Sequence, residues 1–371
     1  MSQTFLNHIL IFTTKIKFQT FTLASMWRKI LFPFSLVWWL VLSIRHLLYD
    51  WNILKSKRAS VFTLVIGNLS LGGTGKSPHA IWFIKQINQM KLKTGFLSRG
   101  YGRTSQGFQL VTSISTTSNS GDEAKLIANH FSQMPCAVAE NRLDGIDQLV
   151  KIYPDIDIMV LDDAFQHRAL NPHFSVVLFD FESLRKNNYL IPVGNNRDVK
   201  WRLNYCDAII ISKSPEKVDE NQLIDLFKQY QKPVFVSRLM YANPYNYYQN
   251  EESETWKSDK WLFFSGIAKP DYVVNYLKSV DVDFISKEFK DHVQFDKQSI
   301  EKLQLTANKE NRKLLCTEKD WVKIAELTSD NNFWIKNCFV LPVDVYFSPI
   351  QEQQLKQLLY ARYHSSNQRN S

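Results

Sequence analysis

The chain has 371 residues, of which 44% are hydrophobic and 22% charged, and its formal net charge is +9. This composition excludes an intrinsically disordered protein, and the length predicts two domains of ordinary size. The cysteines are widely spaced, which speaks against a disulfide framework or a zinc site and fits a reducing compartment. The four are Cys136, Cys206, Cys316 and Cys338.

The positive charge is concentrated in residues 1–60, which contain eight basic side chains and a single acid, Asp50. A basic excess that flanks an apolar segment favours an anionic membrane surface over nucleic acid. The apolar segment 30–44 would measure about 22 Å as a helix, less than the roughly 30 Å of a hydrocarbon core. It is therefore a helix in or partly inserted into the membrane interface, which Trp38 and Trp39 favour, a short span, or a core helix.

Residues 61–78 predict a strand, a glycine-rich turn and the start of a helix. Residues 61–66 have the apolar, β-branched composition of a buried strand, and Gly-Lys-Ser closes the turn at 75–77. Backbone amides of such a turn bind phosphate, Lys76 reaches the β- and γ-phosphates, and Ser77 coordinates Mg²⁺. Ser70 stands where the P-loop pattern has its first glycine, so a glycine turn without ligand is the alternative. The residues expected to bind ATP are Ser70, Leu71, Gly72, Gly73, Thr74, Gly75, Lys76 and Ser77.

Strand-like and helix-like segments alternate from residue 61 to about residue 238, and again after residue 260. This alternation predicts an α/β protein with a doubly wound, mostly parallel sheet and a second, smaller α/β domain. Functional side chains are expected at the carboxyl ends of the strands. The expected segments are an extension or over-called start at 1–25, a membrane-associated helix at 26–58, a core domain at 59–240, a linker at 241–259 and a C-terminal domain at 260–371.

Charged residues follow several of these strands. Asp162 and Asp163 end an apolar run, as the Mg²⁺-binding acid of a P-loop protein does, although such an aspartate is commonly a turn or capping residue. Arg99 and Tyr101 lie on a glycine-hinged loop after a strand. The loop either binds phosphate through its arginines or is a mobile surface loop. Gln166, in the segment after the aspartates, is expected to contact nucleotide or acceptor.

A kinase that acts on an alcohol needs a group that takes the hydroxyl proton. Asp122, which opens a helix after Gly121, is one candidate, but an N-cap role explains it equally well. Asp291 and His292 lie in a short loop of the second domain, and residues 317–320 follow a strand there. A lone histidine is more often structural than catalytic.

Taken together, these strings resemble the tetraacyldisaccharide 4'-kinase family of lipid A biosynthesis. The carrying strings are Met26-Trp-Arg-Lys, Gly67-Asn-Leu-Ser-Leu-Gly-Gly-Thr-Gly-Lys-Ser-Pro, Ser98-Arg-Gly-Tyr-Gly-Arg, Gly121-Asp-Glu, Leu161-Asp-Asp-Ala-Phe-Gln-His-Arg, Phe264-Ser-Gly-Ile-Ala, Asp291-His292 and Thr317-Glu-Lys-Asp. They occur in family order over nearly the whole chain, and the family loop shares the serine at position 70.

The resemblance implies transfer of the ATP γ-phosphate to the 4'-hydroxyl of a tetraacyl glucosamine disaccharide 1-phosphate, with Mg²⁺, at the cytoplasmic face of the inner membrane. It implies Asp122 as general base with His292, Asp162 and Asp163 as metal-site acids, and no nucleic-acid or obligate protein partner. Arg197 matches a family arginine, whereas Asp198 replaces the family glutamate in the metal neighbourhood.

Three other interpretations remain open. A membrane-associated P-loop switch or positioning ATPase would often carry a lysine where this chain has Leu71. A soluble small-molecule kinase would leave residues 26–58 unexplained. A nucleotide-binding scaffold would not need so many acids at strand ends.

Overall fold

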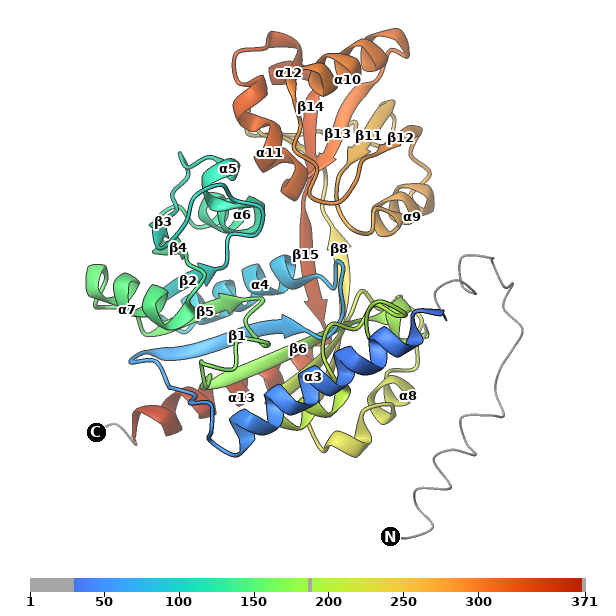
Figure 1. Ribbon diagram of the computed structural model, residues 1–371. Helices are drawn as coiled ribbons and strands as arrows, with labels where there is room; N and C mark the ends of the chain where they lie inside the picture. Colours follow the sequence, from blue (N-terminus) through green and yellow to red (C-terminus); the bar gives the residue numbers. More distant parts are fainter. Residues whose placement is uncertain (1–29, 186–188, 369–371) are drawn as a thin grey trace.

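The computed structural model describes residues 30–185 and 189–368, and these form two α/β domains joined by a pair of strands (Figure 1). The expectation for residues 1–25 lies outside the described residues. The first domain is built on a nine-stranded sheet and the second on a six-stranded sheet. The predicted α/β class with a second, smaller domain is confirmed.

The nine-stranded sheet has the order β15-β8-β7-β6-β1-β5-β2-β4-β3, with antiparallel pairing only at its edge strands β15 and β3. Its strands are β1 (Phe62–Asn68), β2 (Thr94–Ser98), β3 (Gln109–Leu110), β4 (Cys136–Val138), β5 (Ile158–Asp162), β6 (Phe174–Asp180), β7 (Ala208–Ser212), β8 (Val234–Tyr241) and β15 (Val343–Phe347). The central strands are buried along their whole length, because helices cover both faces of the sheet.

Helices α4, α6 and α13 supply the apolar side chains on one face of this sheet, and α7 and α8 supply those on the other. The helices of the first domain are α3 (Phe32–Asp50), α4 (Lys76–Gln89), α5 (Thr117–Ser120), α6 (Asp122–His130), α7 (Arg142–Ile152), α8 (Glu220–Asp225) and α13 (Pro349–Asn367), with 3₁₀ turns η1 (Phe181–Arg185), η2 (Lys200–Tyr205) and η3 (Lys228–Tyr230). This two-sided covering is the doubly wound arrangement that the alternation predicted.

The second domain has the strand order β10-β9-β14-β13-β11-β12, parallel from β14 to β12. Its strands are β9 (Tyr245–Asn246), β10 (Glu251–Glu252), β11 (Trp261–Ser265), β12 (Phe284–Glu288), β13 (Lys313–Thr317) and β14 (Cys338–Leu341). Its helices are α9 (Asp271–Ser279), α10 (Lys297–Lys309), α11 (Glu318–Thr328) and α12 (Asn332–Asn337).

The C-terminal segment departs from the predicted domain boundaries. Residues 260–371 were expected to form the second domain, but Pro342 separates β14 of the second sheet from β15, which pairs with β8 of the first. Helix α13 then returns to the first domain, where Leu355 and Leu359 are buried. Likewise, the expected linker at 241–259 contributes β9 and β10 to the second sheet. The crossing between domains is therefore made by β8 and β15 (Figure 1).

Helix α3 lies on the outside of the first domain (Figure 1). Ser35, Leu42 and His46 share one helical face and are buried, whereas Trp38 and Trp39 are 37% and 46% exposed. The helix is long and apolar enough to cross a membrane by length and composition. At 19 residues it reaches roughly 28 Å, further than the segment 30–44 suggested. Its exposed apolar surface is not that of a core helix.

Candidate active site

A cavity of about 780 Å³ lies between the two domains, at the carboxyl ends of the central strands of the first sheet. Most of the predicted site residues line it. These are Ser70, Leu71, Gly72, Gly73, Thr74, Gly75, Lys76, Ser77, Arg99, Tyr101, Asp162, Asp163, Gln166, Arg197 and His292. Of the predicted residues, Asp122 and Asp198 do not line the cavity, and their positions are described below.

The loop from Ser70 to Gly75 connects β1 to the N-terminus of α4. Gly72 and Gly75 have φ angles of 98° and 84°, a region that favours glycine, so these two positions give the turn its shape. The side-chain amide of Asn68 donates to Oγ1 of Thr74 at 2.9 Å, and the hydroxyl of Ser212 donates to the Thr74 carbonyl at 2.7 Å. Polar side chains of β1 and β7 therefore fix the loop at Thr74.

His79 supports the same loop from the first turn of α4. Its Nδ1 donates to the carbonyl of Gly75 at 2.7 Å, and its Nε2 accepts from the Ser237 hydroxyl at 2.9 Å. Complete burial lowers the pKa of His79 to about 4, so the ring is neutral at neutral pH. A neutral ring is the form that can both donate and accept these two hydrogen bonds.

Asp163 joins the P-loop lysine to an arginine from a distant segment. Its carboxylate lies 3.7 Å from Lys76 Nζ. It also accepts hydrogen bonds from both terminal nitrogens of Arg197, one of them at 2.9 Å. Burial by itself would raise the pKa of Asp163, but the charges of Lys76 and Arg197 outweigh it and hold the pKa low. Arg197 also donates to the Asn68 side chain, so this arginine supports the loop as well.

Asp162 has the properties expected of a cation ligand. Its side chain is buried, and Oδ1 has no hydrogen-bond partner. Burial raises the pKa of Asp162 well above its usual range, and the nearby carboxyl of Glu123 raises it further. Two carboxylates held together in a buried position favour either a proton or a cation between them.

Among the residues that the structure describes, no cluster of three or more His, Cys, Asp or Glu side chains is arranged to hold a metal ion. Mg²⁺ does not need such a cage, because it commonly takes one or two carboxylates together with water and substrate phosphates. Ser77, Asp162 and Glu123 all belong to this part of the cavity wall. Their oxygen donors fit Mg²⁺.

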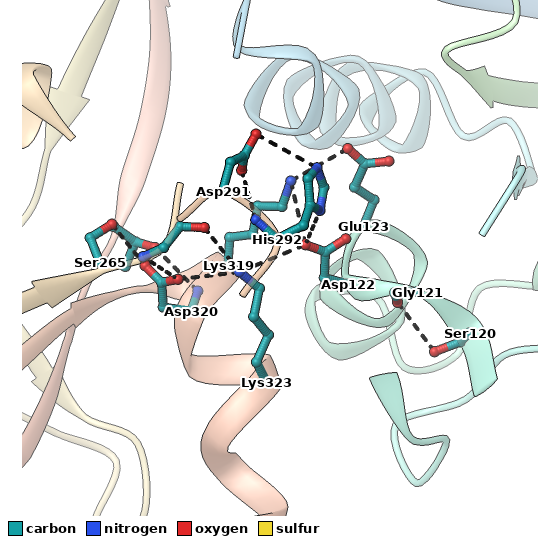
Figure 2. Close-up of polar contacts among 12 residues, drawn as sticks. Ser120, Gly121, Asp122, Glu123, Ser265, Asp291, His292, Lys319, Asp320 and Lys323 are labelled. Atoms are coloured by element: carbon teal, nitrogen blue, oxygen red, sulfur yellow. Dashed lines mark hydrogen bonds and ion pairs between the residues drawn. The ribbon is translucent and has the colours of Figure 1, made fainter. Parts of the chain in front are cut away.

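The second domain supplies the partner of Asp122. Nδ1 of His292 lies 3.0 Å from Oδ2 of Asp122, and Lys319 and Lys323 approach the same oxygen at 3.5 and 3.9 Å (Figure 2). Burial by itself would raise the pKa of Asp122, but the bond from His292 and the two ammonium groups outweigh it and lower the pKa. Asp122 is thus held as a carboxylate, and His292 lies between it and the cavity.

The loop that carries His292 is fixed by its own neighbours. The backbone amide of His292 donates to Asp291 Oδ1 at 3.0 Å, and the imidazole packs at a tilt against the Tyr101 ring, with centroids 5.0 Å apart. Asp320, from the 317–320 string, accepts from Ser265, Gly266 and Thr317 instead of facing the cavity. The other three members of that string, Thr317, Glu318 and Lys319, line the cavity.

A group of cations lines the part of the cavity nearest α3. Arg142 is 3% exposed, its Nε has no hydrogen-bond partner, and burial together with the charge of Arg99 lowers its pKa to about 10. His167 has a buried Nε2 without a partner, and Arg45, from α3, lines the same wall. Burial also lowers the pKa of His167, so its ring is neutral. The charges of these arginines and the unpartnered Nε of Arg142 make this wall suitable for an anion.

The structure does not bring Asp198 to the predicted metal neighbourhood. Asp198 is 1% exposed, and its Oδ1 accepts from His46 Nε2 at 2.7 Å and from the Val199 amide at 2.8 Å. These donors hold one carboxylate oxygen against α3, whereas Oδ2 is buried without a hydrogen-bond partner. Its neighbour Arg197 reaches the cavity, because adjacent side chains of this segment point in different directions.

Sequence reasoning missed several residues of the cavity. Glu123 follows the proposed base directly, and its place beside Asp162 depends on how α6 packs. Arg45 directly follows the apolar segment 30–44, so the sequence indicated only a basic residue that flanks a membrane helix. Lys213, which directly follows β7, carried only the general signal of a charged residue at a strand end.

Comparisons with known proteins show the family of the chain. A family model described as tetraacyldisaccharide-1-P 4'-kinase, LpxK, matches residues 27–364. The chain is 32% identical to the tetraacyldisaccharide 4'-kinase of Cytophaga hutchinsonii, over 88% of this chain and 93% of that one. It is 31% identical to the enzyme of the same name from Bacteroides thetaiotaomicron, over 92% and 95%.

A solved structure gives the same result at the level of the fold. The crystal structure of LpxK from Aquifex aeolicus in complex with ATP superposes with a TM-score of 0.71 at 25% identity, covering 91% of this chain and 99% of that one. The family model, which matches residues 27–364, spans both domains and the N-terminal helix. The chain therefore belongs to the tetraacyldisaccharide-1-P 4'-kinase family.

Proposed function

We propose that this chain transfers the γ-phosphate of ATP to the 4'-hydroxyl of a tetraacyl glucosamine disaccharide 1-phosphate, at the cytoplasmic face of the inner membrane. The observation that carries the proposal is that one cavity joins a P-loop, ending in Lys76 and Ser77, to the Asp122–His292 pair of two domains. Family membership supports the reaction class, and the ATP complex of the Aquifex aeolicus relative supports the phosphate donor.

The P-loop binds the triphosphate. The loop amides and Lys76 balance the charge of its β- and γ-phosphates. Asp163 holds the lysine in place and is itself held by Arg197. Ser77, Asp162 and Glu123 would hold Mg²⁺, as the unpartnered Oδ1 of Asp162 suggests. When bound, the ion neutralises charge on the phosphates.

The Asp122–His292 pair takes the proton of the acceptor hydroxyl. His292 lines the cavity, whereas Asp122 contacts it through His292 Nδ1. A carboxylate with a lowered pKa is a weak base alone, but it orients the imidazole and stabilises its protonated form. We therefore assign proton transfer to the pair, with Asp122 as the buried anion.

The cationic wall suits the acceptor, which already carries a phosphate. Arg45, Arg99 and Arg142 face the cavity, and buried donors of Arg142 and His167 have no partner. Tyr101 and Gln166 line the same wall, where the Tyr101 hydroxyl can donate to the sugar and the unpartnered Oε1 of Gln166 can accept from a sugar hydroxyl. This wall adjoins α3, so the sugars would sit in the cavity while the acyl chains remain beside the helix.

Helix α3 brings the enzyme to a substrate that stays in the membrane. Removing acyl chains from a bilayer costs about 0.8 kcal/mol for each CH₂ group, so four chains hold the substrate firmly in place. The exposed Trp38 and Trp39 suit the headgroup level, and Arg45 suits anionic lipid. Neither nucleic acid nor an obligate protein partner is part of the proposal.

The test is a transfer assay with γ-labelled ATP and purified disaccharide 1-phosphate in mixed micelles. Label should appear on the lipid with the wild type and disappear with Lys76→Met. Label released only as inorganic phosphate, with lipid unmodified, would instead support a P-loop switch ATPase. A disaccharide that lacks the 4'-hydroxyl is the matched negative substrate.

A further inference from the structure

A polar cluster at the carboxyl ends of β6 and β7 joins the P-loop to the second domain. It comprises Asp180 and Lys213 of the first domain, and Lys269 and Tyr272 of the second. We call these four residues the interdomain cluster. The phosphate-binding and proton-transfer roles described above leave them without a function.

The first-domain half arises from strand order. Asp180 ends β6 and pairs in register with Ser212, the last residue of β7, so Lys213 follows directly beside it. Lys213 Nζ lies 3.6 Å from Asp180 Oδ2 and donates to the carbonyl of Gly73 at 2.8 Å. Because Ser212 holds the next carbonyl, that of Thr74, two consecutive P-loop carbonyls depend on the end of β7.

The second-domain half closes around the same carboxylate. Lys269 Nζ lies 2.7 Å from Asp180 Oδ1, and the Tyr272 hydroxyl lies 3.2 Å from each carboxylate oxygen. The Tyr272 ring also lies 4.4 Å from Lys213 Nζ, a cation–π distance. The Asp180 side chain is fully buried by these contacts.

Direct packing accompanies the polar contacts. A Cβ placed on Gly73 would lie 3.2 Å from Cβ of Ala268, which immediately precedes Lys269. The P-loop backbone therefore touches the second domain where Lys213 holds it. If the second domain moved away, Asp180 would lose its contacts with Lys269 and Tyr272. Lys213 would keep its contact with Asp180 but lose the Tyr272 ring.

We propose that the interdomain cluster couples nucleotide binding to the docking of the second domain, with Asp180 and Lys213 as positioning residues for the P-loop. The proposal rests on the proposed kinase function only in taking ATP as the ligand. Docking of the second domain fixes Lys213, and Lys213 fixes the Gly73 carbonyl in the phosphate-binding conformation. Reciprocally, nucleotide that favours this conformation stabilises the docked domain.

Asp180 separates this proposal from direct nucleotide contact. Lys213, Lys269 and Tyr272 line the cavity, so replacing any of them could remove a ligand contact, but Asp180 does not line it. Asp180→Asn keeps the shape and removes the charge. Lys278→Met is the control for Lys269→Met, because Lys278 is an exposed lysine of α9, the helix that begins two residues after Lys269.

The first experiment measures the affinity of the full-length chain for a non-hydrolysable ATP analogue, without acceptor. We expect Asp180→Asn and Lys269→Met each to weaken binding by about fivefold to tenfold, within the usual range of coupling between sites. Lys213→Arg should retain most of the affinity that Lys213→Met loses. The double variant of Asp180→Asn and Lys269→Met should lose less than the product of the two effects, because both act on one unit. Wild-type affinity in Asp180→Asn would overturn the proposal.

The second experiment measures the distance between spin labels on α7 and α10, at the exposed positions Gln148 and Asn308. The four native cysteines are buried, so introduced cysteines can be labelled selectively. The analogue should narrow the distance distribution in the wild type and in Lys278→Met, but much less in Asp180→Asn. Equal narrowing in all three would refute coupling.

The two proposals fail in different ways. A wild-type chain that binds nucleotide but phosphorylates no lipid contradicts the proposed function and leaves the cluster experiments interpretable. An Asp180→Asn chain with normal affinity and normal narrowing contradicts the cluster proposal alone.

Discussion

Nδ1 of His292 lies 3.0 Å from Oδ2 of Asp122, although 170 residues separate them and they belong to different domains. Asp122 opens helix α6 of the first domain, and His292 lies in the loop after β12 of the second. The proposed proton acceptor therefore exists only while the domains are together. This separation is a way to prevent transfer to water before the acceptor has bound.

Replacing Asp122 tests the buried half of the pair. Asp122→Asn should lower kcat by roughly 10²–10⁴-fold, the usual contribution of a positioned acid or base. The KM for ATP should change little, because Asp122 does not line the cavity. Steady-state kinetics measure both values, with Asp147→Asn on the exposed face of α7 as the matched control. Near-wild-type turnover would contradict the assignment.

Replacing His292 tests whether the pair acts as one unit. His292→Gln should lower kcat by a similar factor, and combining it with Asp122→Asn should add little further loss. The measurement is a double-mutant cycle on the rate constant of phosphate transfer, determined under single-turnover conditions. Fully multiplicative losses would indicate that the two residues work independently.

Asp162 and Asp198 should respond in opposite ways to the same change. Asp162→Asn should raise the Mg²⁺ concentration needed for half-maximal activity, with little loss of thermal stability, since Oδ1 has no partner to lose. Asp198→Asn should destabilise the fold by about 1–3 kcal/mol through the buried contact with His46, at unchanged Mg²⁺ requirement. Melting curves and Mg²⁺ titrations measure both. An Asp198→Asn chain with normal stability and a higher Mg²⁺ requirement would restore Asp198 to the metal site.

The apolar face of α3 can be tested without deleting the helix, whose other face is buried. Replacing Trp38 and Trp39 together by Ser should reduce partition onto anionic vesicles by about tenfold, because each indole loses apolar contact area. A sedimentation assay measures partition. Tyr360→Ser, an exposed aromatic on α13, serves as control and should change nothing. Equal partition of both variants would mean that α3 does not hold the protein to the membrane.

Lys213 predicts a dependence of stability on pH. Burial lowers the pKa of Lys213 from 10.5 to about 8, although Asp180 opposes the shift. The charge of Lys269 also lowers the pKa of Lys213, and the charge of Glu182 raises it, as that of Asp180 does. Between pH 8 and 10.5 the unfolded chain binds more protons than the native one, so this residue makes stability rise with pH, by about 3 kcal/mol in total.

Lys213→Met removes that titration. The stability of Lys213→Met relative to wild type should therefore be highest below pH 8 and fall as the pH rises to 10.5. Thermal melting of both chains across this range measures the difference, with Lys278→Met as an exposed control. If the stability difference between Lys213→Met and wild type did not vary with pH, burial would not lower the pKa of Lys213.

The sequence was sufficient for features that depend on local pattern. The apolar run of β1, the two positive-φ glycines and the Lys76–Ser77 ending predict the P-loop, since each is required by the chain's own neighbours. The run 158–161 ending in Asp162 and Asp163 placed acids at the cavity for the same reason. The ordered motifs also sufficed to indicate the family.

Tertiary structure decided what depends on contacts between distant segments. Only packing determines that β15 and α13 return to the first sheet, that Glu123 stands beside Asp162, and that Asp198 faces His46. The cluster of Lys213, Lys269 and Tyr272 has no local signature either, because three side chains from two distant segments share one buried carboxylate, that of Asp180. A polar side chain is buried only where neighbouring segments supply its hydrogen-bond partners. Those segments are distant in the sequence, so a local pattern does not specify them.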